Sequence, residues 1–243
     1  MNSATGSPIL SVDSLSVSFG GKRVIANLSF SVPRGENLAI VGPNGSGKTV
    51  LLRTLLGMLP YAGSIHWAPG VRLGYVPQSV AADLQLPIFA SDLLAAKARI
   101  LRIPRDAIAR AAAATAITPD MLGTRIGTLS GGQFQKVLIT FALLGDPDVL
   151  LVDEPTASLD ELAGEHIYEL LDRLRRERNL TVLLISHDLS IIYQRATSVL
   201  CLSKGTPCFG KPQQILTPEI LAEVYSARPE FFHHLHSHAE RPQ

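Results

Sequence analysis

The sequence predicts an α/β fold organised around a parallel β-sheet, and three observations lead to that prediction. Residues 38–41, 149–152 and 182–185 are short, continuous apolar runs, as expected of strands that are buried on both faces. Segments with apolar residues at helical spacing follow the first two runs, and strand–helix–strand alternation is typical of parallel sheets. The chain has 243 residues, 46% of them hydrophobic, which is enough for a self-sufficient core.

The N-terminal part follows a different pattern. Between residues 12 and 32 apolar and polar residues alternate, and Gly20-Gly21 interrupts the alternation. This pattern predicts a pair of antiparallel strands. Residues 65–76 are also strand-like on either side of a turn at 68–70. We therefore expect an N-terminal antiparallel β subdomain in front of the parallel sheet.

The middle of the chain is predicted to be helical. Residues 79–128 contain no strong strand run, whereas 107–116 are rich in alanine and follow Pro104. We expect a helical subdomain at about 79–145, inserted in a larger domain that spans 8–230. Residues 231–243 are expected to form a flexible tail.

Three further elements are predicted towards the C-terminus. One apolar stripe, made of Leu162, Ile167, Leu170, Leu171 and Leu174, predicts a helix between two strands. A hairpin is expected around Lys204-Gly205. A last helix is expected to begin at Thr217-Pro218, because Thr is a good N-cap and Pro suits the first turn.

Composition and charge exclude several classes of function. Lys and Arg number 22 against 21 Asp and Glu, so the net charge is 22 − 21 = +1, which favours no nucleic-acid partner. The N-terminus lacks a secretory signal, and the apolar runs are much shorter than the roughly 20 residues of a membrane helix. Cys201 and Cys208 are too few for a disulfide framework, so we expect structural cysteines in a reducing compartment.

A glycine-rich segment lies between a predicted strand and a predicted helix. Residues 42–49, GPNGSGKT, fit the pattern G-x-x-x-x-G-K-[ST] and are called the phosphate loop below. Its glycines let backbone N–H groups converge on an anion, and the following helix adds the positive end of its dipole. Lys48 would neutralise the outer phosphates and Thr49 would hold Mg²⁺. The predicted nucleotide contacts here are Gly42, Pro43, Asn44, Gly45, Ser46, Gly47, Lys48, Thr49 and Val50.

Two carboxylates end the predicted strand at 149–152. Asp153 and Glu154 follow it directly, at the sheet edge where phosphate-handling folds present their ligands. Taken alone, they could be ordinary surface acids after a strand. Beside a phosphate loop, Asp153 is better interpreted as a Mg²⁺ ligand and Glu154 as the base that orients the attacking water. These features predict a P-loop NTPase that uses ATP and Mg²⁺.

The segment LSGGQ at 129–133, called the signature segment below, indicates which family of P-loop NTPases the sequence resembles. With the phosphate loop, it makes the sequence resemble the ATP-binding subunits of ABC transporters from about residue 10 to 225. By this resemblance Gln78 corresponds to the Q-loop, 158–160 to the D-loop and His187 to the H-loop. Phe19 stands where the family stacks an aromatic on adenine. The family fold is a RecA-like core with a helical insertion that carries the signature.

The resemblance also implies a mechanism and partners. Two copies would bind head to tail, so that ATP on one phosphate loop is covered by the signature segment of the other copy. Glu154, His187, Gln78 and Lys48 would serve hydrolysis, and Thr49, Gln78 and Asp153 would hold Mg²⁺. Further nucleotide contacts would come from Phe19, Ser130, Gly131, Gly132, Gln133 and Asp160. Membrane permease subunits and, indirectly, a periplasmic or lipoprotein solute-binding protein are the implied partners, with this chain peripheral on the cytoplasmic face of the inner membrane.

Details around the signature segment look like the zinc/manganese/iron branch of bacterial importers. The tail contains His233, His234, His236 and His238, which could bind a metal ion through imidazole. A solvated tail in which these histidines bind nothing is an equally good interpretation.

Rival functions keep the same nucleotide motifs. A soluble ATPase of this superfamily could act in DNA repair, translation or iron–sulfur cluster assembly. Repair members insert long coiled coils and translation members join two such domains, and neither feature is present here, so cluster assembly is the remaining rival. A non-hydrolysing ATP-binding regulator is disfavoured by the intact Lys48, Glu154 and His187. A small-molecule kinase would have no use for LSGGQ.

Overall fold

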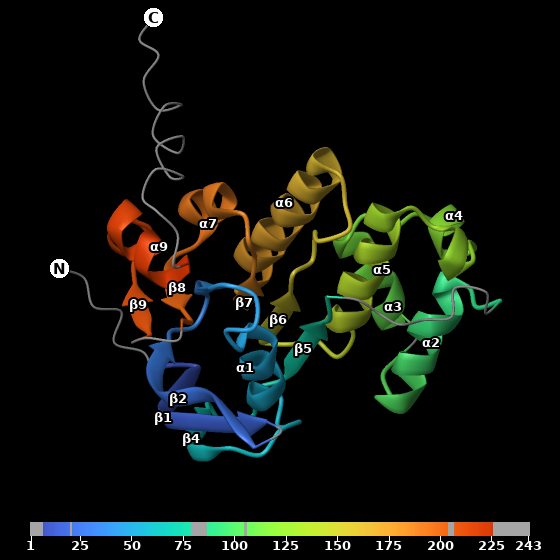
Figure 1. The fold of residues 1–243 in the computed structure, drawn as a ribbon. Helices are drawn as coiled ribbons and strands as arrows, with labels where there is room; N and C mark the ends of the chain where they lie inside the picture. Colours follow the sequence, from blue (N-terminus) through green and yellow to red (C-terminus); the bar gives the residue numbers. More distant parts are fainter. Residues whose placement is uncertain (1–6, 20, 79–86, 105, 204–206, 226–243) are drawn as a thin grey trace, which may run out of the picture. The chain divides into compact units, whose positions relative to one another are not determined.

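The computed structural model describes residues 7–19, 21–78, 87–104, 106–203 and 207–225 (Figure 1). The chain divides into two compact units, Met1–Trp67 with Leu184–Gln243, and Ala68–Leu183. Strand β7 (Thr181–Ile185) contains the boundary between them. Within the described ranges, no helix combines the length and the hydropathy that crossing a membrane requires.

An antiparallel sheet in the first unit confirms the predicted β subdomain. Strands β1 (Leu10–Phe19), β2 (Lys22–Val32) and β4 (Ala62–Trp67) are arranged in the order β2-β1-β4 (Figure 1). In the second half of β2 buried and exposed residues alternate, as the sequence pattern requires of a sheet with one covered face. Strand β4 is one half of the segment predicted at 65–76.

The other strands of the first unit include the strand that leads into the phosphate loop. Strand β3 (Asn37–Val41) is buried throughout and pairs in parallel with β8 (Ser198–Cys201), which pairs with β9 (Cys208–Gly210) in antiparallel fashion. The helices of this unit are α1 (Lys48–Leu55), α7 (Leu189–Arg195), α8 (Pro212–Ile215) and α9 (Pro218–Tyr225). The Thr217 hydroxyl accepts a hydrogen bond from Ile220 N–H, 3.4 Å, so α9 begins as predicted.

The second unit combines two parallel strands with most of the helices. Strand β5 (Leu73–Val76) pairs with β6 (Val149–Asp153), and Val76 lies opposite Val152. The helices are α2 (Ala90–Ile100), α3 (Asp106–Ala114), α4 (Pro119–Leu122), the 3-10 turn η1 (Ile126–Thr128), α5 (Gly131–Leu143) and α6 (Glu161–Arg178). Helices α2 to α5 share a small core that includes Ala90, Ala112 and Val137.

Helix α6 forms as predicted, but one residue of its expected stripe does not belong to the core. Ile167, Leu170, Leu171 and Leu174 are buried, whereas Leu162 is 64% exposed. Leu162 lies in the first turn, five residues before Ile167, and 500° of helical rotation places it 140° away from that residue. The prediction for Leu162 was therefore wrong.

A lysine joins α2 to the end of α5. Lys97 Nζ donates a hydrogen bond to the Phe141 carbonyl, 2.6 Å, and lies 4.3 Å from the centre of the Phe141 ring. The carbonyl belongs to the last turn of α5, where acceptors lack the regular helical partner, and the Leu144 N–H also donates to it at 3.3 Å. Burial lowers the pKa of the Lys97 ammonium from 10.5 to about 8.

The lowered pKa of Lys97 should make the free energy of unfolding depend on pH. Because its pKa is lower in the folded state, the unfolded chain binds more protons between pH 8 and pH 10.5, so Lys97 should make stability rise with pH across that window. Urea unfolding at pH 7.5 and pH 9.5 measures the change. Lys97→Met should remove this contribution, and the same substitution at the exposed Lys211 should keep it. Equal pH dependence in the parent and Lys97→Met would contradict the prediction.

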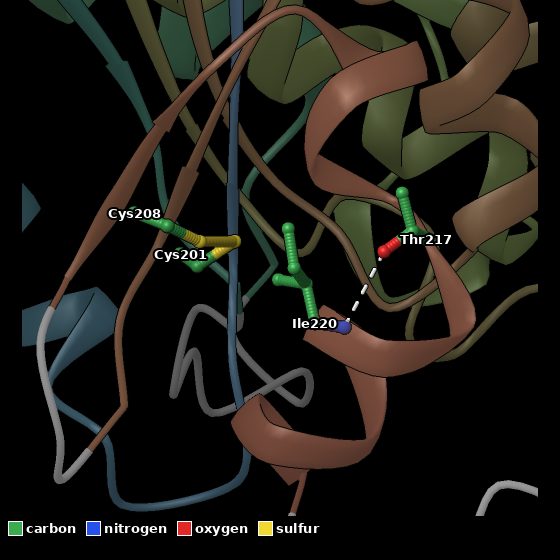
Figure 2. The surroundings of a disulfide bond; sticks show 4 residues. All are labelled: Cys201, Cys208, Thr217 and Ile220. Carbon is green, nitrogen blue, oxygen red and sulfur yellow. Dashed lines mark hydrogen bonds between the residues drawn. A yellow bond between two sulfur atoms is a disulfide. The ribbon is translucent and has the colours of Figure 1, made fainter.

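The two cysteines form a disulfide between β8 and β9 (Figure 2). Cys201 and Cys208 face each other directly in the antiparallel register, with their Cα atoms 4.9 Å apart. The sequence predicted structural cysteines in a reducing compartment, and it did not predict that the two would be bonded to each other. Seven positions of separation predict no pairing until the hairpin register is known.

Candidate functional site

The phosphate loop joins β3 to α1 and takes a conformation that requires glycine. Gly42 has φ 148° and Gly47, the N-cap of α1, has φ 101°. A Cβ atom on Gly42 would lie only 2.0 Å from the Leu202 carbonyl oxygen, and one on Gly47 would lie 2.9 Å from the Val24 side chain. The loop therefore packs closely against the rest of its own unit, with no room for side chains at these two positions. A helix follows the loop as predicted, and it begins at Lys48.

Polar groups inside this loop fit an anionic ligand. Lys48 is 6% exposed, and its Nζ donates to the carbonyl oxygens of Gly42, 2.8 Å, and Pro43, 3.2 Å, which curls the ammonium over the loop. The Ser46 hydroxyl is buried and finds no hydrogen-bond partner within the described part of the chain. A buried orphan hydroxyl beside a lysine and the start of a helix is the chemistry of a phosphate site.

A residue outside the motif also contacts the loop. Burial raises the pKa of Tyr225, the last residue of α9, and the nearby Gly42 backbone N–H lowers it. Tyr225 and Leu202 were not predicted as site residues, because neither belongs to a recognisable pattern.

The second unit brings Gln78 and Glu154 together. Gln78 Nε2 donates to Glu154 Oε2 at 2.7 Å, since both residues follow strands that pair in parallel register. Asp153 is 1% exposed at the end of β6, and the Tyr75 hydroxyl lies 3.5 Å from its Oδ2. The parallel pairing of β5 and β6 thus gathers three predicted site residues at one strand end, with Tyr75 as an addition.

Glu154 has an unusual backbone. Its φ is 44°, in the left-handed region that glutamate rarely occupies and that costs about 1–2 kcal/mol. It stands between the buried Asp153 and Pro155. The turn leaves the side chain half-buried and directed to Gln78. Strain at a carboxylate that ends a strand is typical of a functional position.

The signature segment begins helix α5. The Ser130 hydroxyl accepts from Gln133 N–H, 3.3 Å, and Gln133 Oε1 accepts from Ser130 N–H, 2.9 Å, which is a reciprocal capping box. Both polar side chains are thereby engaged with the helix end. The first N–H groups of α5, at Gly131 and Gly132, are the groups that a helix itself cannot satisfy.

Gly131 also has little room for a side chain. A Cβ on Gly131 would lie 2.8 Å from Cδ2 of Leu159 in the predicted D-loop. We expect Gly131→Ala to destabilise the fold by at most about 1 kcal/mol in urea unfolding, because the atom in the way is the end of a flexible leucine side chain, which can move. Leu159→Ala in the same chain should recover part of that loss, which a double-mutant cycle measures. Gly132→Ala is the matched control, since its nearest neighbour would be at 3.6 Å. Additive losses for Gly131 and Leu159 would contradict this contact.

The remaining predicted residues lie as follows. Asp160 is the N-cap of α6, and its Oδ1 accepts from Ala163 N–H at 2.8 Å. His187 is exposed, two residues beyond the end of β7. Phe19 ends β1 opposite Lys22, and its side chain lies outside the described part of the structure. The four tail histidines lie outside the described residues as well.

Comparison with known proteins decides the family. The sequence profile of the family described as ABC transporter matches residues 25–157, more than half of the chain. The chain belongs to the ABC transporter family. The match includes the phosphate loop, the signature segment, Gln78, Asp153 and Glu154.

The similarity to individual proteins extends over most of the chain. The zinc import ATP-binding protein ZnuC of Ruegeria pomeroyi is 40% identical over 225 residues, 92% of this chain and 84% of that protein. ZnuC of Jannaschia sp. is 41% identical over 216 residues, 88% of this chain and 87% of that protein. Among solved structures, a metal-chelate type ABC transporter in an inward-facing conformation superposes with a TM-score of 0.81 at 28% identity, covering 90% of this chain and 89% of that one.

These matches confirm the predicted fold and enzyme class. The protein has the ABC ATPase fold, binds ATP and hydrolyses it to power transport. The roles of the individual site residues remain predictions, which the geometry above makes specific.

Proposed function

We propose that this chain is the ATP-hydrolysing subunit of an importer for a divalent metal ion, with zinc as the first candidate. The observation that carries the proposal is the similarity to zinc import ATP-binding proteins, 40–41% identical over about nine tenths of the chain. The metal-chelate type transporter among the solved structures supports a cargo that contains a metal.

In this proposal the first unit binds the triphosphate. Backbone N–H groups of residues 42–49 and the N-terminus of α1 surround the phosphate oxygens. Lys48 exchanges its two loop carbonyls for the outer phosphates, and Ser46 gains the hydrogen-bond partner that it lacks. His187 binds the γ-phosphate, and Phe19 stacks on the adenine.

Hydrolysis in this proposal depends on Glu154. Its carboxylate orients a water molecule for attack on the γ-phosphorus and accepts the water proton. Gln78, which already donates to Glu154, transmits changes at that carboxylate to the helical subdomain. Thr49, Gln78 and Asp153 offer the hard oxygen donors that suit Mg²⁺ and would hold it, and the ion would neutralise phosphate charge.

The signature segment acts on a second copy of the chain in this proposal. Because the Ser130 and Gln133 side chains cap α5, the N–H groups of Gly131 and Gly132 are the donors to the γ-phosphate of the other copy, with Ser130, Gln133 and Asp160 beside them. The dimer drives conformational change in membrane permease subunits. A metal-binding lipoprotein or periplasmic protein delivers the metal ion to those subunits. The chain then lies peripherally on the cytoplasmic face of the inner membrane.

Isolation of the tagged chain from membranes tests this function. We expect a multi-span permease to copurify, and the complex in liposomes to take up Zn²⁺ when ATP is supplied. Glu154→Gln in the same complex is the control that should abolish uptake. Copurification with soluble scaffold proteins, without any integral membrane protein, would instead favour cluster assembly. Uptake of Mn²⁺ or Fe²⁺ in preference to Zn²⁺ would change the identity of the transported metal and leave the transport function in place.

A further inference from the structure

The cysteine pair lies directly beside the residue that supports the phosphate loop, Leu202, which follows the last residue of β8. Cys201 is the parallel partner of Val41, the residue that precedes the loop. The next residue, Leu202, donates its N–H to the Val41 carbonyl at 2.8 Å and places its own carbonyl oxygen against Gly42. The disulfide therefore ties β9 to the strand on which Gly42 rests.

The same disulfide is part of the surface on which α9 packs. Cys201 is fully buried in a cluster with Val41, Ile215 and Val224, and Cys208, Ile220 and Tyr225 pack against that cluster. Figure 2 shows Ile220 of α9 beside the two sulfur atoms. Because the Tyr225 hydroxyl lies near the Gly42 N–H, α9 is a second connection from the cysteine pair to the phosphate loop.

We propose that Cys201 and Cys208 form a reversible thiol–disulfide site that tunes nucleotide binding through β8 and α9. The pair is suited to switching in place, since a Cα separation of 4.9 Å lies within the ordinary range of disulfides and each cysteine is the other's direct neighbour across the hairpin. Cys208 is half-buried, so it is the thiol that a reagent reaches first.

The reaction takes a small-molecule disulfide as oxidant. The Cys208 thiolate attacks one sulfur of that disulfide, forms a mixed disulfide and releases one thiol. The Cys201 thiolate then attacks the Cys208 sulfur and releases the second thiol. The protein loses two electrons and two protons, and the small disulfide is reduced to two thiols. Dithiothreitol reverses the reaction.

A direct test compares one purified protein in two redox states. The chain has two cysteines, so thiol titration should count two after dithiothreitol and none after oxidised glutathione. Calorimetric titration with a Mg²⁺-bound, non-hydrolysable ATP analogue should give an affinity about 3–10-fold lower in the reduced state, the loss expected when one hydrogen bond to the loop loosens. Cys208→Ser should bind the analogue like the reduced parent in both buffers.

Two further comparisons keep the result interpretable. Far-UV circular dichroism checks that both states and Cys208→Ser are folded, and reduced and reoxidised parent protein avoids any substitution. Equal affinity in the two states would overturn the inference while leaving ATP binding intact. Two thiols that persist in excess oxidised glutathione would overturn it as well. Absence of binding in both states would overturn ATP binding itself, on which the inference depends.

Discussion

Glu154→Gln is expected to lower the ATPase rate about 10²–10⁴-fold while ATP binding is retained. The substitution removes the base that accepts the water proton, yet its amide oxygen can still accept the hydrogen bond from Gln78 Nε2. Uncleaved ATP should then hold two copies together. Size-exclusion chromatography with Mg·ATP should show a dimer of the 26.1 kDa chain, and phosphate release measures the rate.

A matched control separates this effect from loss of charge. Glu165 is exposed on α6, and Glu165→Gln should hydrolyse ATP at the parent rate and form no trapped dimer. Parent-like hydrolysis by Glu154→Gln would show that another group activates the water. A monomer in saturating ATP would instead count against the head-to-tail arrangement.

Gly42→Ala is expected to disable nucleotide binding by steric means alone. The new methyl group would stand 2.0 Å from the Leu202 carbonyl oxygen, a backbone atom that can yield only if β8 or the loop moves. We expect about 3 kcal/mol less stability in urea unfolding. The affinity for ATP should fall about 100-fold, because misplacement of the loop by an ångström is costly.

Gly57→Ala, in the same unit but outside the loop, is the control. Gly57 also has a positive φ, 73°, but a Cβ there would meet nothing within 4 Å. It should cost about 1 kcal/mol from backbone strain and leave the affinity for ATP unchanged. Equal losses for the two variants would mean that strain, and not the contact with Leu202, makes glycine necessary at position 42.

Much of the fold could be predicted because local patterns and topology agree. Residues 38–41 and 149–152 became buried strands with parallel partners, and the helix after the phosphate loop begins at Lys48. Leu162 could not be placed, since apolar character alone does not reveal whether a residue in the first turn reaches the core. The disulfide was missed for a related reason: a cross-strand pair depends on the register of a hairpin, which two cysteines seven positions apart do not encode.

The candidate site was predicted as a set of residues but not as a set of contacts. The family resemblance identified Gln78 and the end of a predicted strand identified Glu154, and only the β5–β6 register brings the two side chains to 2.7 Å. The support for Gly42 from Leu202 and Tyr225 comes from residues 160 to 183 positions away, in segments without any motif. Such contacts arise from tertiary packing, which no local pattern specifies.

The capping box at the start of α5 bears on how the signature segment constrains evolution. Its serine and glutamine are occupied with each other, and its first glycine is confined by a leucine. The groups that the segment presents to a ligand are therefore backbone N–H groups. A backbone N–H has the same chemistry in every residue that carries one. Selection at Gly131 then acts on the absence of a side chain, so a lineage could lose the motif there by gaining a single methyl group.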